Sequence, residues 1–233
     1  SPWWVDSNAN TTDNPRHLFF DNSDTFFGNS DALVDLDWIR EKGLIIPSKN
    51  IYDFEILATR SDSHKHIIFN ALKDYPGSKY LHFLNPTDIT YQVQTKNPST
   101  YDPKFDYWTV PPASKYINHE QLYNIKYSSS VLIPLNTYFA PAEFENYSPL
   151  YITEKFLEDL MTNKPVLPIG HKGTVQYLCD LGFQFPEWID YSYDVVEDPN
   201  VRLKKFLGSV SSLANIPNLS DLSIEWQQTA TNR

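Results

Sequence analysis

The chain has 233 residues, of which 41% are hydrophobic and 21% charged, and this composition predicts a globular protein of one or two domains. The net charge of −10 argues against an extended nucleic-acid surface, which needs clustered Lys and Arg, but it leaves room for a local basic pocket. Cys179 is the single cysteine, so we expect no disulfide within the chain and a reducing, cytoplasmic location. The sequence contains no apolar run of about 18 residues, so we expect no membrane-spanning helix.

The first fifty residues predict little regular structure. Residues 1–16 are polar and rich in turn formers, and 17–20 form a short apolar run typical of a strand. Apolar residues at helical spacing over 30–43, with Gly43 as the stop, predict one helix. We therefore expect residues 1–50 to form an N-terminal arm with few elements.

Strands and helices alternate from residue 51 onwards. Apolar runs over 51–59 and 79–84 predict strands, and the helical period over 62–77 predicts a helix between them. Residues 85–128 are rich in Pro and Tyr without a clear period, so we expect a long insertion of the kind that often carries function. The inward positions of the 62–77 helix are expected to be Ile67, Ile68, Ala71 and Leu72.

The alternation resumes after the insertion. Strands separated by helices indicate a parallel α/β sheet of the doubly wound, Rossmann-like type. We expect one domain over 51–215, followed by a C-terminal tail over 216–233. Strands are predicted over 129–136 and 165–170, and helices over 152–163, 173–183 (closed by Gly182) and 200–215.

Two turns lie where a parallel α/β sheet binds its ligands, after the carboxyl ends of strands. They are 58–63, which contains Arg60, and 170–174, which offers the amides of Gly170 and Gly173 and the hydroxyl of Thr174. Such turns place amides at helix N-termini and favour anions. Every α/β sheet has turns of this kind, so a plain strand–helix connection stays the alternative.

Glu154 and Lys155 form the most specific charged pair. The apolar pattern puts Ile152, Phe156, Leu157 and Leu160 inward, so the pair is expected on the open side of its helix. One interpretation is that the carboxylate complements the positive helix end and the lysine is solvated. The other is that the carboxylate accepts both hydroxyls of a ribose while the ammonium binds a diphosphate.

The segment around this pair resembles a known donor-binding signature. "ENYSPLYITEKF" (145–156), followed by "KPVLPIG", is similar to the signature of the α1,3-fucosyltransferases (family 10 type) and of related short bacterial and phage glycosyltransferase-like proteins. The resemblance covers roughly residues 51 to 213. Leu150 stands where the family has Asp, and Tyr191 stands where it has Glu. These departures put the identity of the donor in doubt.

The resemblance implies a GT-B-type donor lobe with a reduced N-terminal lobe, in which 1–50 form part of the acceptor side. Glu154 would bind the ribose and Lys155 the diphosphate of a nucleotide sugar. Arg60, with Lys65, would add positive charge at the diphosphate, although a surface salt bridge is an equal alternative for Arg60. The remaining donor-binding candidates are Asn146, Tyr151, Thr153, Gly170, Gly173 and Thr174.

The implied reaction is sugar transfer from a nucleotide diphosphate to an acceptor hydroxyl, without a metal or other cofactor and with inversion. The general base is open among Asp21, Asp24 and Glu55. The Asp-Leu-Asp triplet at 35–37 falls within a predicted helix, where it does not suit a metal site. The acceptor is an unknown glycan, lipid or protein, and a partner could supply the acceptor lobe that fifty residues are too short to form.

Two other functions stay open. A non-catalytic module that binds nucleotide sugars or glycans would explain why no base can be chosen. A sugar transferase acting on modified phage DNA is disfavoured by the net charge of −10. Transfer or hydrolysis of a donor that is lost in Lys155→Ala would separate an enzyme from a binding module.

Overall fold

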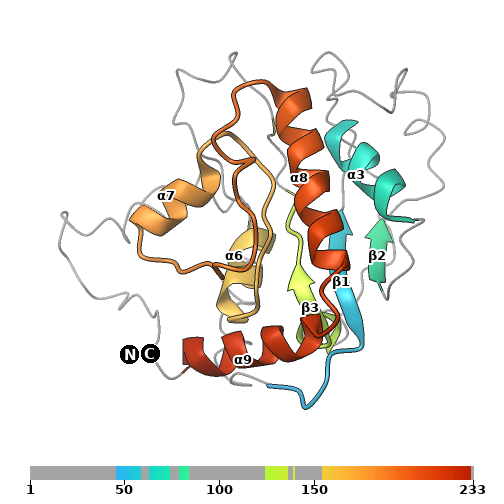
Figure 1. The fold of residues 1–233 in the computed structure, drawn as a ribbon, viewed down its shortest axis with the longest axis vertical. Coiled ribbons are helices and arrows are strands. Elements are labelled where there is room, and N and C mark those ends of the chain that lie inside the picture. Colours follow the sequence, from blue (N-terminus) through green and yellow to red (C-terminus); the bar gives the residue numbers. More distant parts are fainter. Residues whose placement is uncertain are drawn as a thin grey trace.

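A computed structural model describes residues 46–58, 63–73, 79–83, 124–135, 139 and 154–231 (Figure 1). The strand expected at 17–20, the helix expected at 30–43 and most of the 85–128 insertion lie outside these ranges. Their predictions, and the domain boundary at residue 50, therefore stay predictions.

The described core is a parallel α/β structure. Strands β1 (Tyr52–Ala58), β2 (Lys79–Phe83) and β3 (Ser129–Leu132) form a sheet in the order β2-β1-β3. Both pairings are parallel, with Ile56 opposite Leu81 and Phe54 opposite Val131. The parallel part of the fold prediction is thus confirmed. Consecutive residues of β1 and β3 are buried, as expected when both faces of a parallel sheet are covered.

The predicted strand at 165–170 continues the sheet beyond β3 only as isolated bridges. Val166 pairs with Leu132 and Ile169 with Leu135, both in the parallel sense. The Leu167 amide donates to the Leu132 carbonyl at 2.8 Å, which fixes the register. The extended pairing expected over the whole segment is therefore reduced to these contacts.

Two tyrosines bond the other edge of this segment. The Tyr191 hydroxyl donates to the Val166 carbonyl at 2.9 Å, and the Tyr193 hydroxyl donates to the Pro168 carbonyl. The backbone amides of residues 167 and 169 face β3, so the proline ring at 168 sits on the side where a missing N–H costs no sheet hydrogen bond. Side-chain hydroxyls thus take the place of a further strand along this edge.

Five helices accompany the sheet in the described ranges. Figure 1 shows α8 running alongside the strands, where it contacts α3. Helix α9 lies across the end of the sheet at which β3 begins, and it contacts β3. The main core lies between α3, α8 and the sheet and includes Phe54, Val131 and Phe206. The helices are α3 (Ser63–Lys73), α6 (Glu154–Met161), α7 (Thr174–Asp180), α8 (Pro199–Ala214) and α9 (Leu219–Thr231).

Two expectations about the helices are wrong. Ala71 of α3 is exposed, whereas Ile67, Ile68 and Leu72 are buried as expected. The segment 216–233, expected as a tail, contains α9. Two of its inward positions are polar: Ser223 donates to the Ser130 carbonyl at 2.6 Å and Gln227 to the Thr162 carbonyl at 2.9 Å.

The start of α8 follows from local sequence. The Asp198 carboxylate accepts a hydrogen bond from the Val201 amide at 2.9 Å, and Pro199 occupies the first helical position. We expect Asp198→Ala to lower the free energy of unfolding by about 1 kcal/mol, because the amide loses its partner. Urea denaturation measures this, with the exposed Glu225→Ala as a control of equal charge change. Equal stability of the two variants would contradict the capping role.

Candidate functional site

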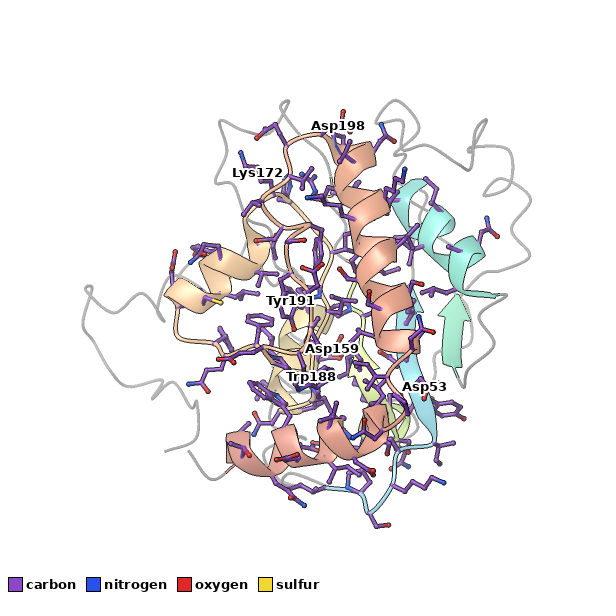
Figure 2. All side chains as sticks on the ribbon, in the orientation of Figure 1. Asp53, Asp159, Lys172, Trp188, Tyr191 and Asp198 are labelled. Carbon is purple, nitrogen blue, oxygen red and sulfur yellow. The ribbon has the colours of Figure 1, made fainter. Side chains whose placement is uncertain are left out.

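The carboxyl edge of the sheet is the candidate site. Because the strands are parallel, the segments that follow β1, β3 and residue 169 all emerge at one edge. Figure 2 places Lys172 and Asp198 at this end of the molecule, whereas Asp53, near the start of β1, lies toward α9. The described segments that come together here are the first turn of α3, Phe139, the 170–174 turn and the first turn of α8.

Glu154 and Lys155 occupy the first two positions of α6. Their side chains lie outside the described atoms, but the helix defines their register. Glu158 follows Glu154 by one turn, and Asp159 follows Lys155 by one turn. Both of these acids are buried, each 3% exposed, so the pair is in register with a buried polar face. The open face expected for Glu154 and Lys155 themselves stays a prediction, while the apolar pattern gave no sign that Glu158 and Asp159 are buried.

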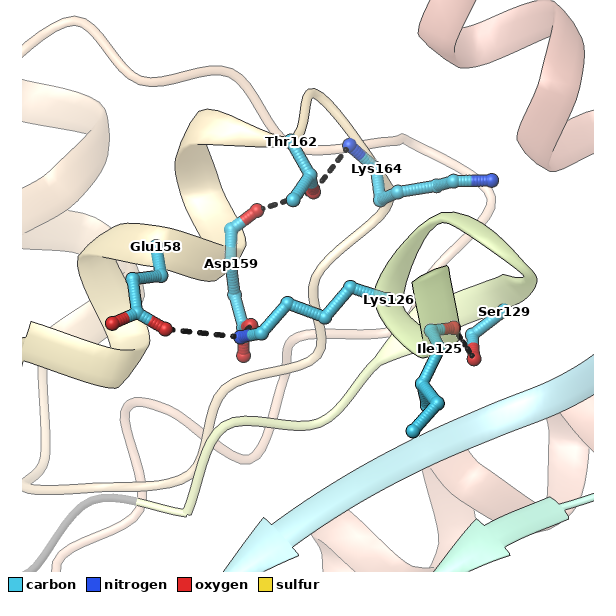
Figure 3. A network of polar contacts seen from close by, with 7 residues as sticks. All are labelled: Ile125, Lys126, Ser129, Glu158, Asp159, Thr162 and Lys164. Carbon is cyan, nitrogen blue, oxygen red and sulfur yellow. Dashed lines mark hydrogen bonds and ion pairs between the residues drawn. The ribbon is translucent and has the colours of Figure 1, made fainter. Parts of the chain in front are cut away.

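A buried lysine explains why these acids lie inside. Lys126 comes from a helical turn over 124–127, just before β3, and is 1% exposed. Its ammonium forms an ion pair with Asp159 and lies 3.6 Å from Glu158 (Figure 3). Burial alone would lower the pKa of Lys126, but the negative charges of Asp159, Glu158 and Glu55 together raise it above its ordinary value. Lys126 therefore stays protonated throughout the physiological pH range.

The candidate bases can be placed only in part. Glu55 is 1% exposed on β1 and contributes to the electrostatic field around Lys126. A general base must come within hydrogen-bond reach of the acceptor hydroxyl, so this buried position argues against Glu55 in that role. Asp21 and Asp24 lie outside the described residues.

The first turn of α3 brings two basic residues to the carboxyl edge. Lys65 is 3% exposed, which is unusual for a lysine. His64 is fully buried, and its ring stacks on Phe139 with the ring centroids 4.9 Å apart. The structure therefore places Lys65 at the expected edge. Arg60, Asn146, Tyr151 and Thr153 lie outside the described residues.

The 170–174 turn uses its amides within the chain. Gly173, at φ 82°, donates its N–H to the Asp194 carbonyl at 2.8 Å. The amides of Val175 and Gln176 each donate to the Asp194 carboxylate at 3.1 Å. Asp194 thus occupies the anion position at the start of α7.

Thr174 and Gly170 are the other residues of the 170–174 turn that were expected to bind a diphosphate. The Thr174 hydroxyl donates to the His171 carbonyl at 2.7 Å, and Gly170 is buried. The role expected for Gly173 and Thr174, donation to a diphosphate, is therefore taken by protein groups in this structure. We do not carry these two residues into the proposed site, whereas the role of Gly170 stays a prediction.

Asp194 and Arg202 lie at the carboxyl edge of the sheet, and the sequence alone did not single them out. Burial raises the pKa of Asp194, while the amides of Val175 and Gln176 and the positive charge of Arg202 oppose that rise. The signal was present in "IDYSYD" (189–194), whose last aspartate follows the two tyrosines that bond residues 166 and 168. No role could be assigned to it before its partner, the start of α7, was known.

Arg202 links three segments at the carboxyl edge. One guanidinium nitrogen donates to the Val196 carbonyl at 2.7 Å and another donates to the Phe139 carbonyl. The guanidinium carbon lies 4.7 Å from the centroid of the Phe139 ring, a cation–π contact. Burial, followed by the charge of Arg202, lowers the pKa of His171, which favours the neutral imidazole at pH 7. Arg202 thus fixes the chain just before residues 140–153, which contain Asn146 and Tyr151.

Within the described ranges, no cluster of three or more His, Cys, Asp or Glu could hold a metal ion. Nor does any helix among these residues have the length and apolar character needed to cross a membrane.

Comparison of the chain with protein-family models, with curated proteins and with solved structures found no match.

Proposed function

We propose that this chain is a nucleotide-sugar-dependent glycosyltransferase, metal-independent and inverting, whose described part is the donor lobe of a Rossmann-like, GT-B-type fold. The observation that carries the proposal is the position of Glu154 and Lys155 as the first two residues of α6. This helix follows β3 in a parallel sheet, and helix N-termini after parallel strands are favourable places for phosphate groups.

The proposed roles follow from charge and hydrogen-bonding capacity. The Glu154 carboxylate accepts hydrogen bonds from both ribose hydroxyls, and the Lys155 ammonium binds the diphosphate. Lys65 and Arg60 add positive charge as the diphosphate departs, which is how an enzyme without a metal stabilises that leaving group. Asn146, Tyr151 and Thr153 complete the nucleotide-sugar pocket.

The proposed reaction is a displacement at the anomeric carbon of the sugar. The acceptor oxygen forms a bond to this carbon on the face opposite the diphosphate, and the bond to the diphosphate oxygen breaks. The diphosphate leaves with the electron pair, and a carboxylate takes the acceptor proton. Asp21, Asp24 and Glu55 are the candidates for this base, with the burial of Glu55 favouring the other two. Residues 1–50, the 85–128 insertion or a partner would complete the acceptor side.

Binding of the donor is the first test. We expect GDP, UDP or CDP, or one of their sugar conjugates, to raise the melting temperature, because a ligand present at about 100 times its Kd stabilises the native state by about 2.7 kcal/mol. Lys155→Ala should remove most of this shift. Lys205→Ala is the matched control, because Lys205 is an exposed lysine of α8 outside the proposed site. If none of these nucleotides shifts the wild-type melting temperature, the proposed function is wrong.

A non-catalytic nucleotide-sugar-binding module is the second candidate, and the burial of Glu55 favours it. That burial argues against one of three candidate bases. The two functions differ in turnover: an enzyme hydrolyses or transfers the donor sugar and loses this activity in Lys155→Ala. A module binds the donor with the same residue dependence and leaves it intact.

A further inference from the structure

Helix α6 is short, and its described side chains include little apolar anchorage. Its eight residues make about two turns. Phe156 is buried against Val166 and Leu178, and Leu160 is half-buried beside them. One buried aromatic residue restrains a helix less well against rotation about its axis than a full apolar stripe does. Polar contacts of the described side chains add to this apolar anchorage.

Lys126 supplies such a contact one turn after the start of the helix, at its fifth and sixth residues. Its ammonium contacts the carboxylates of two consecutive residues, Glu158 and Asp159, from a fixed position at the beginning of β3 (Figure 3). The three side chains are 1% to 4% exposed. Rotation of α6 would separate these buried charges, and separating a buried ion pair is strongly unfavourable.

The other described polar contacts of this region lie at the far end of α6. The Thr162 hydroxyl donates to the Asp159 carbonyl at 2.7 Å and accepts from the Lys164 amide at 3.3 Å (Figure 3). Gln227 of α9 donates to the Thr162 carbonyl at 2.9 Å. These bonds fix where the helix ends. Lys126 acts one turn closer to Glu154 and Lys155, so it controls the direction in which those two positions face.

We propose that Lys126 is a positioning residue for the Glu154–Lys155 pair: by pairing with Glu158 and Asp159, one helical turn further on, it sets the orientation with which the pair meets a nucleoside diphosphate. The inference rests on the proposed function. It extends that function by assigning ribose recognition to a buried ion pair beneath the site. Lys126 acts through α6 and need not touch the nucleotide.

The proposal predicts a change in selectivity as well as in affinity. A correctly oriented Glu154 distinguishes a ribose from a 2′,3′-dideoxyribose, because only the ribose donates two hydrogen bonds to the carboxylate. Loss of two such bonds should weaken binding about tenfold or more in the wild-type protein. When α6 turns, this ratio should fall toward one, and the fall is a readout that a merely structural role of Lys126 would not produce.

The experiment measures the Kd of GDP, UDP and CDP and of their 2′,3′-dideoxy counterparts by calorimetry. Lys126→Met alone leaves buried carboxylates without their cation, so the test uses the triple variant Lys126→Gln, Glu158→Gln, Asp159→Asn, which neutralises the cluster. The matched control neutralises one exposed lysine and two exposed acids of α8 and α9, as Lys205→Gln with Asp221→Asn and Glu225→Gln. We expect the triple variant to lose the preference for ribose and the control to keep it.

Lys126→Arg provides a second measurement if the triple variant does not fold. It keeps the positive charge, but its longer, planar head group must displace α6, so the ratio should fall below that of the wild type. If folded variants keep the wild-type ratio, including a variant that binds every nucleotide equally weakly, the positioning role is overturned and the proposed function stands. If the wild-type protein binds no nucleotide, the proposed function and this inference fall together.

Discussion

Between pH 7 and pH 10.5, the free energy of unfolding of the wild-type protein is expected to rise by about 5 kcal/mol more than that of Lys164→Met. Lys164 is 3% exposed, and burial lowers its pKa from 10.5 to about 7. Its amine donates to the Asn50 side chain at 2.7 Å. Asn50 in turn bonds Ser220 near the start of α9, at 3.0 Å from its amide to the serine hydroxyl. Lys164 is thus connected through Asn50 to the first turn of α9.

The sign follows from proton counts. Below pH 7 the folded and unfolded chains both bind the proton, and the native state carries the full cost of a buried ammonium. Between pH 7 and 10.5 the unfolded chain holds a proton that the folded chain lacks, so stability rises with pH by up to about 1.4 kcal/mol per unit. Above pH 10.5 neither state is protonated and the gain is complete.

Urea denaturation across this pH range measures the difference between wild type and Lys164→Met. Because other groups also titrate, the informative quantity is the difference between the two curves. Lys49→Met is the matched control, since Lys49 is an exposed neighbour of Asn50. Parallel curves for wild type and Lys164→Met would show that Lys164 is not a buried neutral amine.

Arg202→Met should lower the free energy of unfolding by about 3 kcal/mol or more, because hydrogen bonds from a charged donor each contribute about 1.5–3 kcal/mol. The carbonyls of Val196 and Phe139 lose their donor, and Phe139 loses its cation–π contact. The pKa of His171 should rise, because the positive charge that helps to lower it is gone. Chemical denaturation measures the stability, and NMR titration of the His171 ring measures the pKa.

Lys205→Met is the control for this substitution. It removes the same charge from an exposed position of the same helix. Equal stability of Arg202→Met and Lys205→Met would contradict the structural role of Arg202. A fall in stability without a rise in the His171 pKa would mean that the two groups do not interact.

The elements that depend on local sequence were predictable. Glycine stops and apolar runs define short segments, and Gly182, at φ 95°, follows α7 as expected. The alternation of strands and helices predicted a parallel sheet, and the observed order β2-β1-β3 is parallel throughout. Caps such as Asp198 with Pro199 can be read in the same way, because the donor and acceptor lie within one turn.

The contacts of buried polar side chains were not predictable. Helix α9 is attached through Ser223 and Gln227, and α6 through Glu158 and Asp159, which in isolation look like solvated residues. Whether a carboxylate is buried depends on a cation distant in sequence, here Lys126. No periodicity within the helix contains that information.

The sequence by itself determined the alternating α/β pattern and the Glu154–Lys155 pair at the start of a helix, because both depend on residues that are near in the chain. Only the tertiary structure decided that Lys126 pairs with the acids one turn below that pair, and that Asp194 occupies the amides at the start of α7. The physical reason is that a buried charge is tolerated only where opposite charges or donors surround it. That condition is met by packing distant segments together.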